Sequence, residues 1–131
     1  MFWKLYLTAL VIFMLIDMFW LGLVAKNFYQ QQLGFLMKAK ANLLAALIFY
    51  FVFMFGLVVF VIVPGVAKES VTDVIMYGAL FGLVGYSTYD LSNLATLKNW
   101  PFIVTIVDLL WGTMASSLVA LLTCLIALKF F

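Results

Sequence analysis

Four long stretches of apolar residues follow one another along the chain, at about 5–25, 42–63, 74–97 and 101–128. Each exceeds the roughly 20 residues that a helix needs to cross a hydrocarbon layer about 30 Å thick. Backbone groups cannot bond to water within lipid, and the alternation typical of membrane strands is absent. The pattern therefore predicts an all-α polytopic membrane protein, with four transmembrane helices in an up-down bundle that forms one domain over residues 1–131.

The segments between these stretches contain signals for helix ends. Residues 26–40 mix Gln and Lys with aromatic and aliphatic side chains, which is typical of a segment lying at the membrane interface. Pro followed by Gly at 64–65 predicts the end of the second helix. Ser70, with Asp73 three residues later, resembles a capping box that begins the third. Residues 99–101 predict a tight corner, which makes the third and fourth helices an antiparallel hairpin.

The composition fits a membrane-embedded chain and excludes several functions. Of the 131 residues, 69% are hydrophobic and 9% are charged, whereas about a quarter are charged in soluble domains. The formal net charge is +2, with no basic run that could follow a nucleic-acid backbone. The chain has no His and a single Cys, which excludes an internal disulfide, a Ser-His-Asp triad and His-ligated haem. We expect no nucleic-acid partner, no cofactor and no metal site.

The seven lysines divide almost evenly between the two ends of the predicted bundle. We call the end that holds both termini side A and the opposite end side B. Three lysines lie on side A and four on side B, so the positive-inside rule does not predict the orientation. Either the first helix alone fixes the insertion, or the chain inserts in both orientations.

Three carboxyl groups lie within the predicted spans, at Asp17, Asp90 and Asp108. Each would cost about 2.5–3.5 kcal/mol at the centre of a membrane helix. Counted from the side-B ends of their helices at about 1.5 Å per residue, all three lie on the order of 10–14 Å below that interface. Equal depth on three different helices predicts a common site.

Small and polar residues follow one face of the third predicted helix. At about 100° per residue, they fall within an arc of roughly 140°. Glycines at such spacing allow a neighbouring helix to approach closely, and a second small face on the fourth helix includes Gly112. A purely structural contact, in which Asn93 and the tyrosines satisfy Asp90, is the alternative interpretation. The stripe consists of Gly78, Gly82, Gly85, Tyr86, Tyr89, Asp90, Asn93 and Thr96.

The motif Asp-x-x-Trp occurs twice, in residues 17–20 and 108–111. A spacing of three residues places each indole beside the carboxyl group of its own helix, so we expect Trp20 and Trp111 to donate to those carboxylates. Their indole faces could also bind a cationic or sterol-like ligand, while packing of the bundle explains them equally well. Trp100 is predicted to be an interfacial anchor.

No Arg, His or deeply placed Lys is available to pair with the three aspartates. Two states remain for carboxyl groups in a medium of low dielectric: they stay protonated, or a cation occupies the site. A protonated group suits a proton relay or a general acid. A hard cation such as Mg²⁺ or Ca²⁺ is the weaker interpretation, because no ligand spacing in the sequence specifies it.

Several strings of residues resemble a single family. They are Tyr-Asp-Leu-Ser-Asn-Leu-Ala-Thr-Leu at 89–97, Trp-Pro at 100–101, Asp-Leu-Leu-Trp-Gly at 108–112, Asp-Met-Phe-Trp-Leu-Gly at 17–22, Phe-Tyr at 28–29 and Gln-Leu-Gly at 32–34. Through them the chain is similar, over essentially its whole length, to the bacterial membrane proteins catalogued as domain of unknown function 2177. Ser92 stands where the family usually has Thr, and it keeps the hydroxyl. The resemblance implies a four-helix protein of the bacterial cytoplasmic (inner) membrane, with no assigned activity, and the family has no settled catalytic residues that could be carried over.

Three functions follow as hypotheses. The first is that the protein binds a lipid-like hydrophobic molecule from the surrounding membrane lipids, or helps to modify such a molecule. The second is a small proton-coupled transporter, as a homodimer whose interface the glycine stripe supplies. The third is an accessory subunit that docks onto another membrane protein, and the residues do not decide whether the protein is an enzyme. The candidate residues for a substrate or proton site are Asp17, Trp20, Tyr86, Tyr89, Asp90, Asn93, Asp108 and Trp111.

Overall fold

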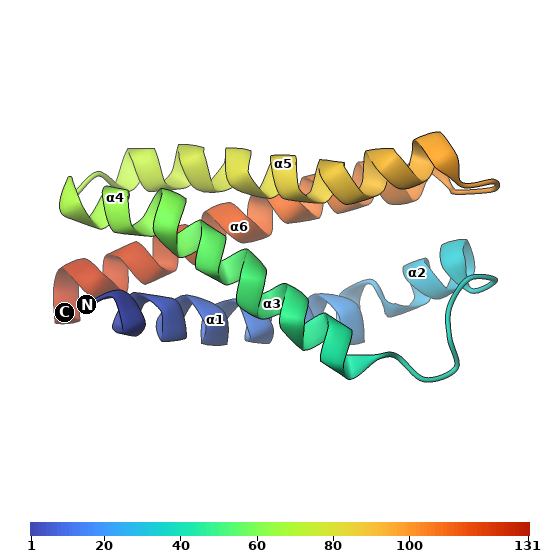
Figure 1. Ribbon diagram of the computed structural model, residues 1–131, viewed down its shortest axis with the longest axis horizontal. Helices are drawn as coiled ribbons and strands as arrows, with labels where there is room; N and C mark the ends of the chain where they lie inside the picture. Colours follow the sequence, from blue (N-terminus) through green and yellow to red (C-terminus); the bar gives the residue numbers. More distant parts are fainter.

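The computed structural model describes residues 1–131 and is built from helices without any strand (Figure 1). Four helical segments are long and apolar enough to cross a membrane: Phe2–Val24, Leu43–Ala67, Val71–Thr96 and Phe102–Phe130. They run alternately in opposite directions, and both chain ends lie at the same end of the bundle, at the left of Figure 1. The predicted all-α fold with four membrane-spanning helices is confirmed.

Eight helical elements make up the four spans and one connection. The first span comprises α1 and a π-helical turn, η1, and a short helix, α2, follows it. The second span comprises α3, a second π-helical turn, η2, and α4, whereas α5 and α6 each form a span alone. The bounds are α1 Phe2–Phe19, η1 Trp20–Val24, α2 Lys26–Leu33, α3 Leu43–Leu57, η2 Val58–Ile62, α4 Val63–Ala67, α5 Val71–Thr96 and α6 Phe102–Phe130.

The prediction that residues 64–65 end the second helix is wrong. The helix continues as α4, with Pro64 in its first turn directly after η2. A first-turn position does not need the missing N–H, and the wider π-helical turn leaves room for the ring. Gly65 is needed because a Cβ there would collide with Val74 of α5, so its role is close packing at the corner rather than termination.

The predicted start of the third helix is confirmed. The Ser70 side chain accepts a hydrogen bond from the Asp73 backbone N–H at 3.2 Å, which satisfies one of the free donors of the first turn. The Asp73 carboxylate forms an exposed ion pair with Lys68 at 3.8 Å. Glu69, with φ at 53°, makes the turn that precedes the cap.

The helices α5 and α6 approach each other most closely where glycines face one another. A Cβ on Gly82 would collide with the Gly112 carbonyl oxygen and with the side chain of Ser116. A Cβ on Gly78 would lie 3.1 Å from the Cα of Ser117 in α6. These glycines are therefore buried in a contact within the chain, and they cannot supply the homodimer interface that the transporter hypothesis assigned to them.

Aromatic rings pack against two further glycines, Gly112 of the small face on α6 and Gly85 of the predicted stripe on α5. The Tyr86 ring lies on Gly112, and Phe53 of α3 lies against Gly85, where a Cβ would be 2.7 Å from its Cε1 atom. Phe53 also contacts Phe13 of α1 and Phe81 of α5, with ring centroids 5.9 and 5.1 Å apart. Phe53 thus joins α3 to both neighbouring spans.

The fully buried side chains concentrate in the half of the bundle nearer side A. There α3, η2 and α6 pack against α1 through residues with no exposed surface, among them Phe13, Met54, Leu57, Val58, Val119 and Cys124. Toward side B, α3 runs diagonally away from the other spans (Figure 1), and its first residues, Leu43 and Leu44, are exposed. This divergence leaves the side-B half less tightly filled.

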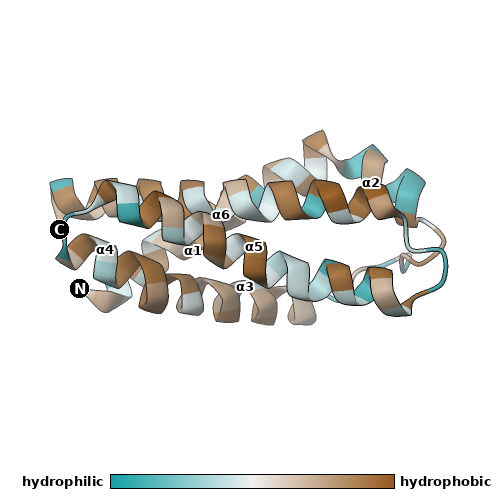
Figure 2. Ribbon diagram, turned by 90° about the horizontal axis from the view of Figure 1, so that it is seen from above, coloured by the Kyte–Doolittle hydropathy of each residue, from teal (hydrophilic) through white to brown (hydrophobic).

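Apolar residues cover the outer surface of the spans, and hydrophilic residues gather in α2 and in the connections at the two ends (Figure 2). Many large side chains on that surface are exposed, including Leu15, Phe60 and Leu110. An exposed apolar surface of this extent is typical of contact with lipid. Membrane lipids are therefore the expected surroundings of all four spans.

We expect Gly82→Ala to destabilise the protein by about 2 kcal/mol or more, because the added methyl group meets a backbone carbonyl that cannot move freely. Gly22→Ala is the matched control, since a Cβ there meets nothing within 4 Å, and it should stay within about 1 kcal/mol of the wild type. Thermal unfolding in detergent, followed by a thiol-reactive dye at the single buried Cys124, measures both variants. Equal midpoints would contradict the close contact of α5 with α6.

Candidate functional site

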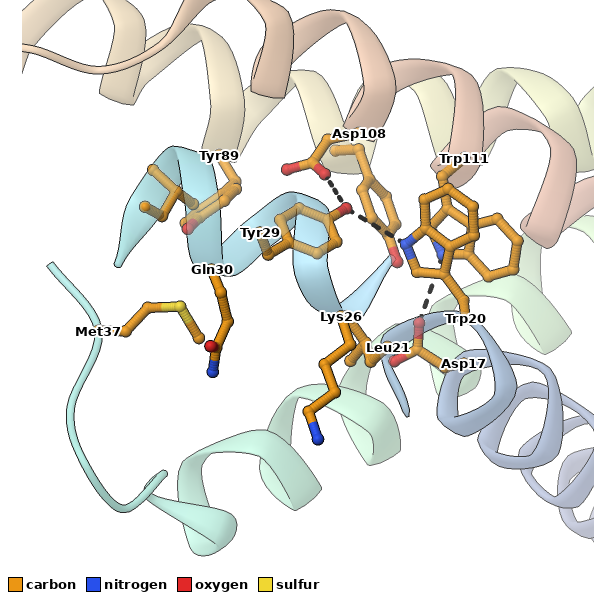
Figure 3. Close-up of a pocket in the computed structure, with 12 residues that line it drawn as sticks. Asp17, Trp20, Leu21, Lys26, Tyr29, Gln30, Met37, Tyr89, Asp108 and Trp111 are labelled. Atoms are coloured by element: carbon orange, nitrogen blue, oxygen red, sulfur yellow. Dashed lines mark hydrogen bonds between the residues drawn. The ribbon is translucent and has the colours of Figure 1, made fainter. Parts of the chain in front are cut away.

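A cavity of about 400 Å³ lies in the side-B half of the bundle, enclosed by η1, α2, α5 and α6 (Figure 3). Two of the three predicted carboxyl groups, those of Asp17 and Asp108, form part of its wall. Both are more than nine-tenths buried. The remaining wall is mostly apolar or aromatic, and the full lining is Asp17, Trp20, Leu21, Lys26, Tyr29, Gln30, Leu33, Met37, Tyr86, Tyr89, Asp108 and Trp111.

Asp17 of α1 receives one hydrogen bond on each carboxyl oxygen. The Tyr50 hydroxyl of α3 donates to Oδ2 at 2.6 Å, and the Trp111 indole N–H of α6 donates to Oδ1 at 3.3 Å. Donors from two different helices therefore hold this carboxyl group in place. A buried carboxyl group needs such partners, because none is supplied by water in the core of a bilayer.

Asp108 of α6 is reached from α2. The Tyr29 hydroxyl donates to its Oδ1 atom and in turn accepts a hydrogen bond from the Trp20 indole N–H at 3.2 Å. Burial, and next the hydrogen bond to Asp108, raise the pKa of the Tyr29 hydroxyl above its usual range, so Tyr29 stays protonated and acts as a donor. The chain Trp20–Tyr29–Asp108 joins η1, α2 and α6.

Neither Trp20 nor Trp111 donates a hydrogen bond to the aspartate of its own Asp-x-x-Trp motif. Trp20 and Trp111 stack with ring centroids 4.4 Å apart and an angle of 7° between their planes. Because the rings overlap between η1 and α6, Trp111 reaches Asp17 on α1, and Trp20 reaches Tyr29, the partner of Asp108. The expectation that each indole donates to the carboxylate of its own helix is wrong.

Asp90 lies behind the cavity wall. Its side chain is fully buried, and no N–H or O–H group donates to either carboxyl oxygen. The alternative in which Asn93 and the tyrosines satisfy Asp90 is therefore wrong. The Asp90 carboxyl group lies near that of Asp108 on the facing helix α6.

A second cavity of about 300 Å³ adjoins the first and opens between α3 and α5. The two cavities share Tyr86, Tyr89 and Asp108, and the second adds Phe49 and Gly85. Phe49 is 44% exposed and Tyr89 57% exposed, so this cavity opens sideways to the outer surface of the spans. Asp108 is the carboxyl group that both cavities reach.

Two of the predicted residues play other parts. Asn93 is half-buried beside Tyr89, and it lines neither cavity. The expectation that Trp100 is an interfacial anchor is wrong, because its ring is buried at the corner before α6. There it donates to Thr105 Oγ1 at 3.0 Å and meets the Tyr89 ring edge to face, with centroids 5.9 Å apart.

Tyr29 and Tyr50 complete the site, and the sequence analysis missed both. Residues 26–40 were expected to lie along the interface, but α2 turns Tyr29 inward over Asp108. The string Phe28-Tyr29, which also resembles the family, could have drawn attention to it. Tyr50 carries the only hydroxyl group among residues 42–63, an apolar stretch in which a hydroxyl needs a partner.

No cation neutralises the carboxyl groups of the site. Lys26 lines the mouth of the cavity, but its Nζ atom points away from Asp17 and Asp108 (Figure 3). The only ion pair in the structure joins Lys68 to Asp73 near side A. No group of three or more His, Cys, Asp or Glu side chains is placed to hold a metal ion. The site is therefore rich in acceptors and poor in charged donors.

Tyr29→Phe should loosen α2, because it removes the hydroxyl that joins this helix to Asp108. A hydrogen bond to a carboxylate contributes about 1.5–3 kcal/mol, so backbone amides of α2 should exchange with deuterium at least tenfold faster. Tyr77→Phe is the control, since Tyr77 of α5 is exposed and forms no hydrogen bond. Unchanged exchange of α2 in Tyr29→Phe would show that the contact does not hold the helix.

The crossed pairing of the tryptophans can be measured with double-mutant cycles. Trp111→Phe combined with Asp17→Asn should give a coupling energy of about 0.5–3 kcal/mol in detergent unfolding, because the two side chains share a hydrogen bond. Trp111→Phe combined with Asp108→Asn should give a smaller value. A larger coupling energy for Trp111 with Asp108 than for Trp111 with Asp17 would contradict the crossed pairing and support a pairing within each helix.

The comparisons with known proteins give one match. The family model described as "Predicted membrane protein (DUF2177)" matches residues 2–125, a range that contains every residue of both cavities. No curated protein and no solved structure matches the chain. Because the match covers nearly the whole chain and the fold supplies four apolar spans, this multi-pass membrane protein belongs to the family of predicted membrane proteins DUF2177.

Proposed function

We propose that the protein binds a lipid-like amphipathic molecule in the side-B leaflet of the membrane. The polar end of this molecule contacts Asp17 and Asp108, and its apolar chain leaves the bundle between α3 and α5. One observation carries the proposal: a largely apolar cavity bears two buried carboxyl groups and joins a second cavity that opens sideways to the lipid.

The size and lining of the cavity support a small amphipathic occupant. Ligand pockets typically measure about 300–1,000 Å³ and combine an apolar wall with a few polar groups. The first cavity, at about 400 Å³, falls in this range, and most of its wall is apolar or aromatic. A molecule of this kind would place its polar end at Asp108 and the adjoining part of its chain against Tyr86 and Tyr89, which line both cavities.

The lateral opening supports delivery from the membrane rather than from solution. Phe49 and Tyr89 flank it and are substantially exposed on the surface that faces lipid. A chain could pass between them while its polar end stays at Asp108, which lines both cavities. The divergence of α3 from the other spans makes this passage available.

The packing toward side A favours a binding site over a transport route through one chain. Beyond the cavity, the bundle is filled by side chains with no exposed surface, including Phe13, Leu57 and Val119. The buried polar side chains of this half, Ser116 and Thr123, carry single hydroxyl groups among apolar neighbours, and water or ions would not cross such a core readily. The family resemblance extends the proposal to the bacterial cytoplasmic membrane as the location.

The test is extraction of the protein from its membrane in a mild detergent, followed by native mass spectrometry of the intact chain. The wild type should retain an amphipathic molecule that is enriched over bulk lipid. Asp108→Asn should lower its occupancy about tenfold, because a hydrogen bond to a charged group contributes about 1.5–3 kcal/mol.

Asp73→Asn is the matched control, because Asp73 is exposed near side A and contacts neither cavity. It should retain the molecule at the level of the wild type. Enrichment of no molecule, or equal retention in Asp108→Asn and Asp73→Asn, would contradict binding at this site.

A further inference from the structure

We infer that the polar end of the bound molecule is a hydrogen-bond donor without negative charge, either a hydroxyl group or a protonated amine on an apolar chain. The inference rests on the proposed function and names the chemical class of its ligand. It follows from a mismatch in the structure: the site offers more acceptors than the chain's own donors satisfy.

The unsatisfied acceptors gather at one place. The Tyr29 hydroxyl occupies Asp108 Oδ1, and no side chain donates to Asp108 Oδ2. Asp90, near Asp108, also receives no N–H or O–H bond on either oxygen, but it lines neither cavity. A ligand in the cavity therefore reaches Asp108, and a donor on that ligand can bond to Asp108 Oδ2 without displacing Tyr29.

The second carboxyl group extends the acceptor surface along the cavity. Each oxygen of Asp17 accepts one hydrogen bond, from Tyr50 or from Trp111. A carboxylate oxygen can accept two, so a head group with more than one donor could bond to Asp17 and Asp108 together. The Tyr86 side chain, which lines both cavities, adds an aromatic surface that also favours an ammonium group.

An anionic head group finds no counter-charge at this depth. The single lysine of the lining, Lys26, stands at the mouth and directs its Nζ atom away from both carboxyl groups (Figure 3). A phosphate or carboxylate placed against Asp108 would meet like charge in a medium of low dielectric. Repulsion of this kind is how a site rejects a competing ligand of otherwise similar shape.

The experiment compares four probes that share one brominated saturated chain and differ only in the head: a primary alcohol, a primary amine, a carboxylate and a phosphate. Bromine atoms in a bound chain quench the fluorescence of Trp20 and Trp111, which line the cavity. The full-length protein is titrated in lipid nanodiscs at neutral pH. The alcohol or the amine should bind at least tenfold more tightly than either acid of the same chain, because only they add a hydrogen bond to Asp108.

Variants of the protein test whether the head group of the probe, rather than its apolar chain, determines the affinity. Asp108→Asn should weaken the preferred probe about tenfold and leave the two acids unchanged or bound more tightly, since it removes the negative charge. Asp73→Asn should reproduce the wild type with all four probes. Each variant's thermal midpoint shows that it remains folded.

The outcomes distinguish the inference from the proposal beneath it. Tightest binding by the carboxylate or the phosphate would overturn the donor head group while supporting a lipid-like ligand in the cavity. Equal binding of all four probes would also overturn it, because the head would then play no part. Quenching by none of the probes would contradict the proposed function itself.

Discussion

The carboxyl groups inside the bundle constrain the side chains around them, because a buried acid needs hydrogen-bond donors and no basic residue of this chain lies near enough to pair with it. The donors are instead phenol and indole groups from η1, α2, α3 and α6. Tyr29, Tyr50 and Trp111 bond directly to the aspartates, and Trp20 holds Tyr29. The same bonds therefore stabilise the carboxyl groups and fix the positions of four helices.

Close packing of α5 and α6 determines how two of the acids meet. The backbones touch at Gly82 and Gly112, where a side chain on either glycine would collide with the opposite helix. Asp108 lies one helical turn from Gly112, and Asp90 lies about two turns from Gly82 on the same side of the contact. Small residues thus allow the Asp90 carboxyl group to lie near that of Asp108. The arrangement of these two acids therefore depends on the close packing of α5 with α6.

The space for a ligand comes from the one span that departs from the bundle. The buried side chains of α3 begin at Phe53, whereas the residues before Tyr50 diverge and leave Phe49 beside an open passage. The short helix α2 covers the end of the resulting cavity, and its attachment depends on Tyr29. The half of the bundle near side A is tightly packed and supports the site, whereas the half near side B is packed more loosely and has room for a ligand.

The sequence by itself determined the class of the fold, the four spans and the start of α5 at Ser70, and it predicted that Asp17, Asp90 and Asp108 lie at similar depth. These features follow from local properties: the length of apolar runs, helix caps and the rise per residue. Only the tertiary structure decided that Trp111 donates to Asp17 across 94 residues of sequence, that α2 folds Tyr29 onto Asp108, and that Pro64 continues a helix. Such contacts depend on how the helices rotate and cross, and helical periodicity places a residue on a face without specifying which neighbour that face will meet.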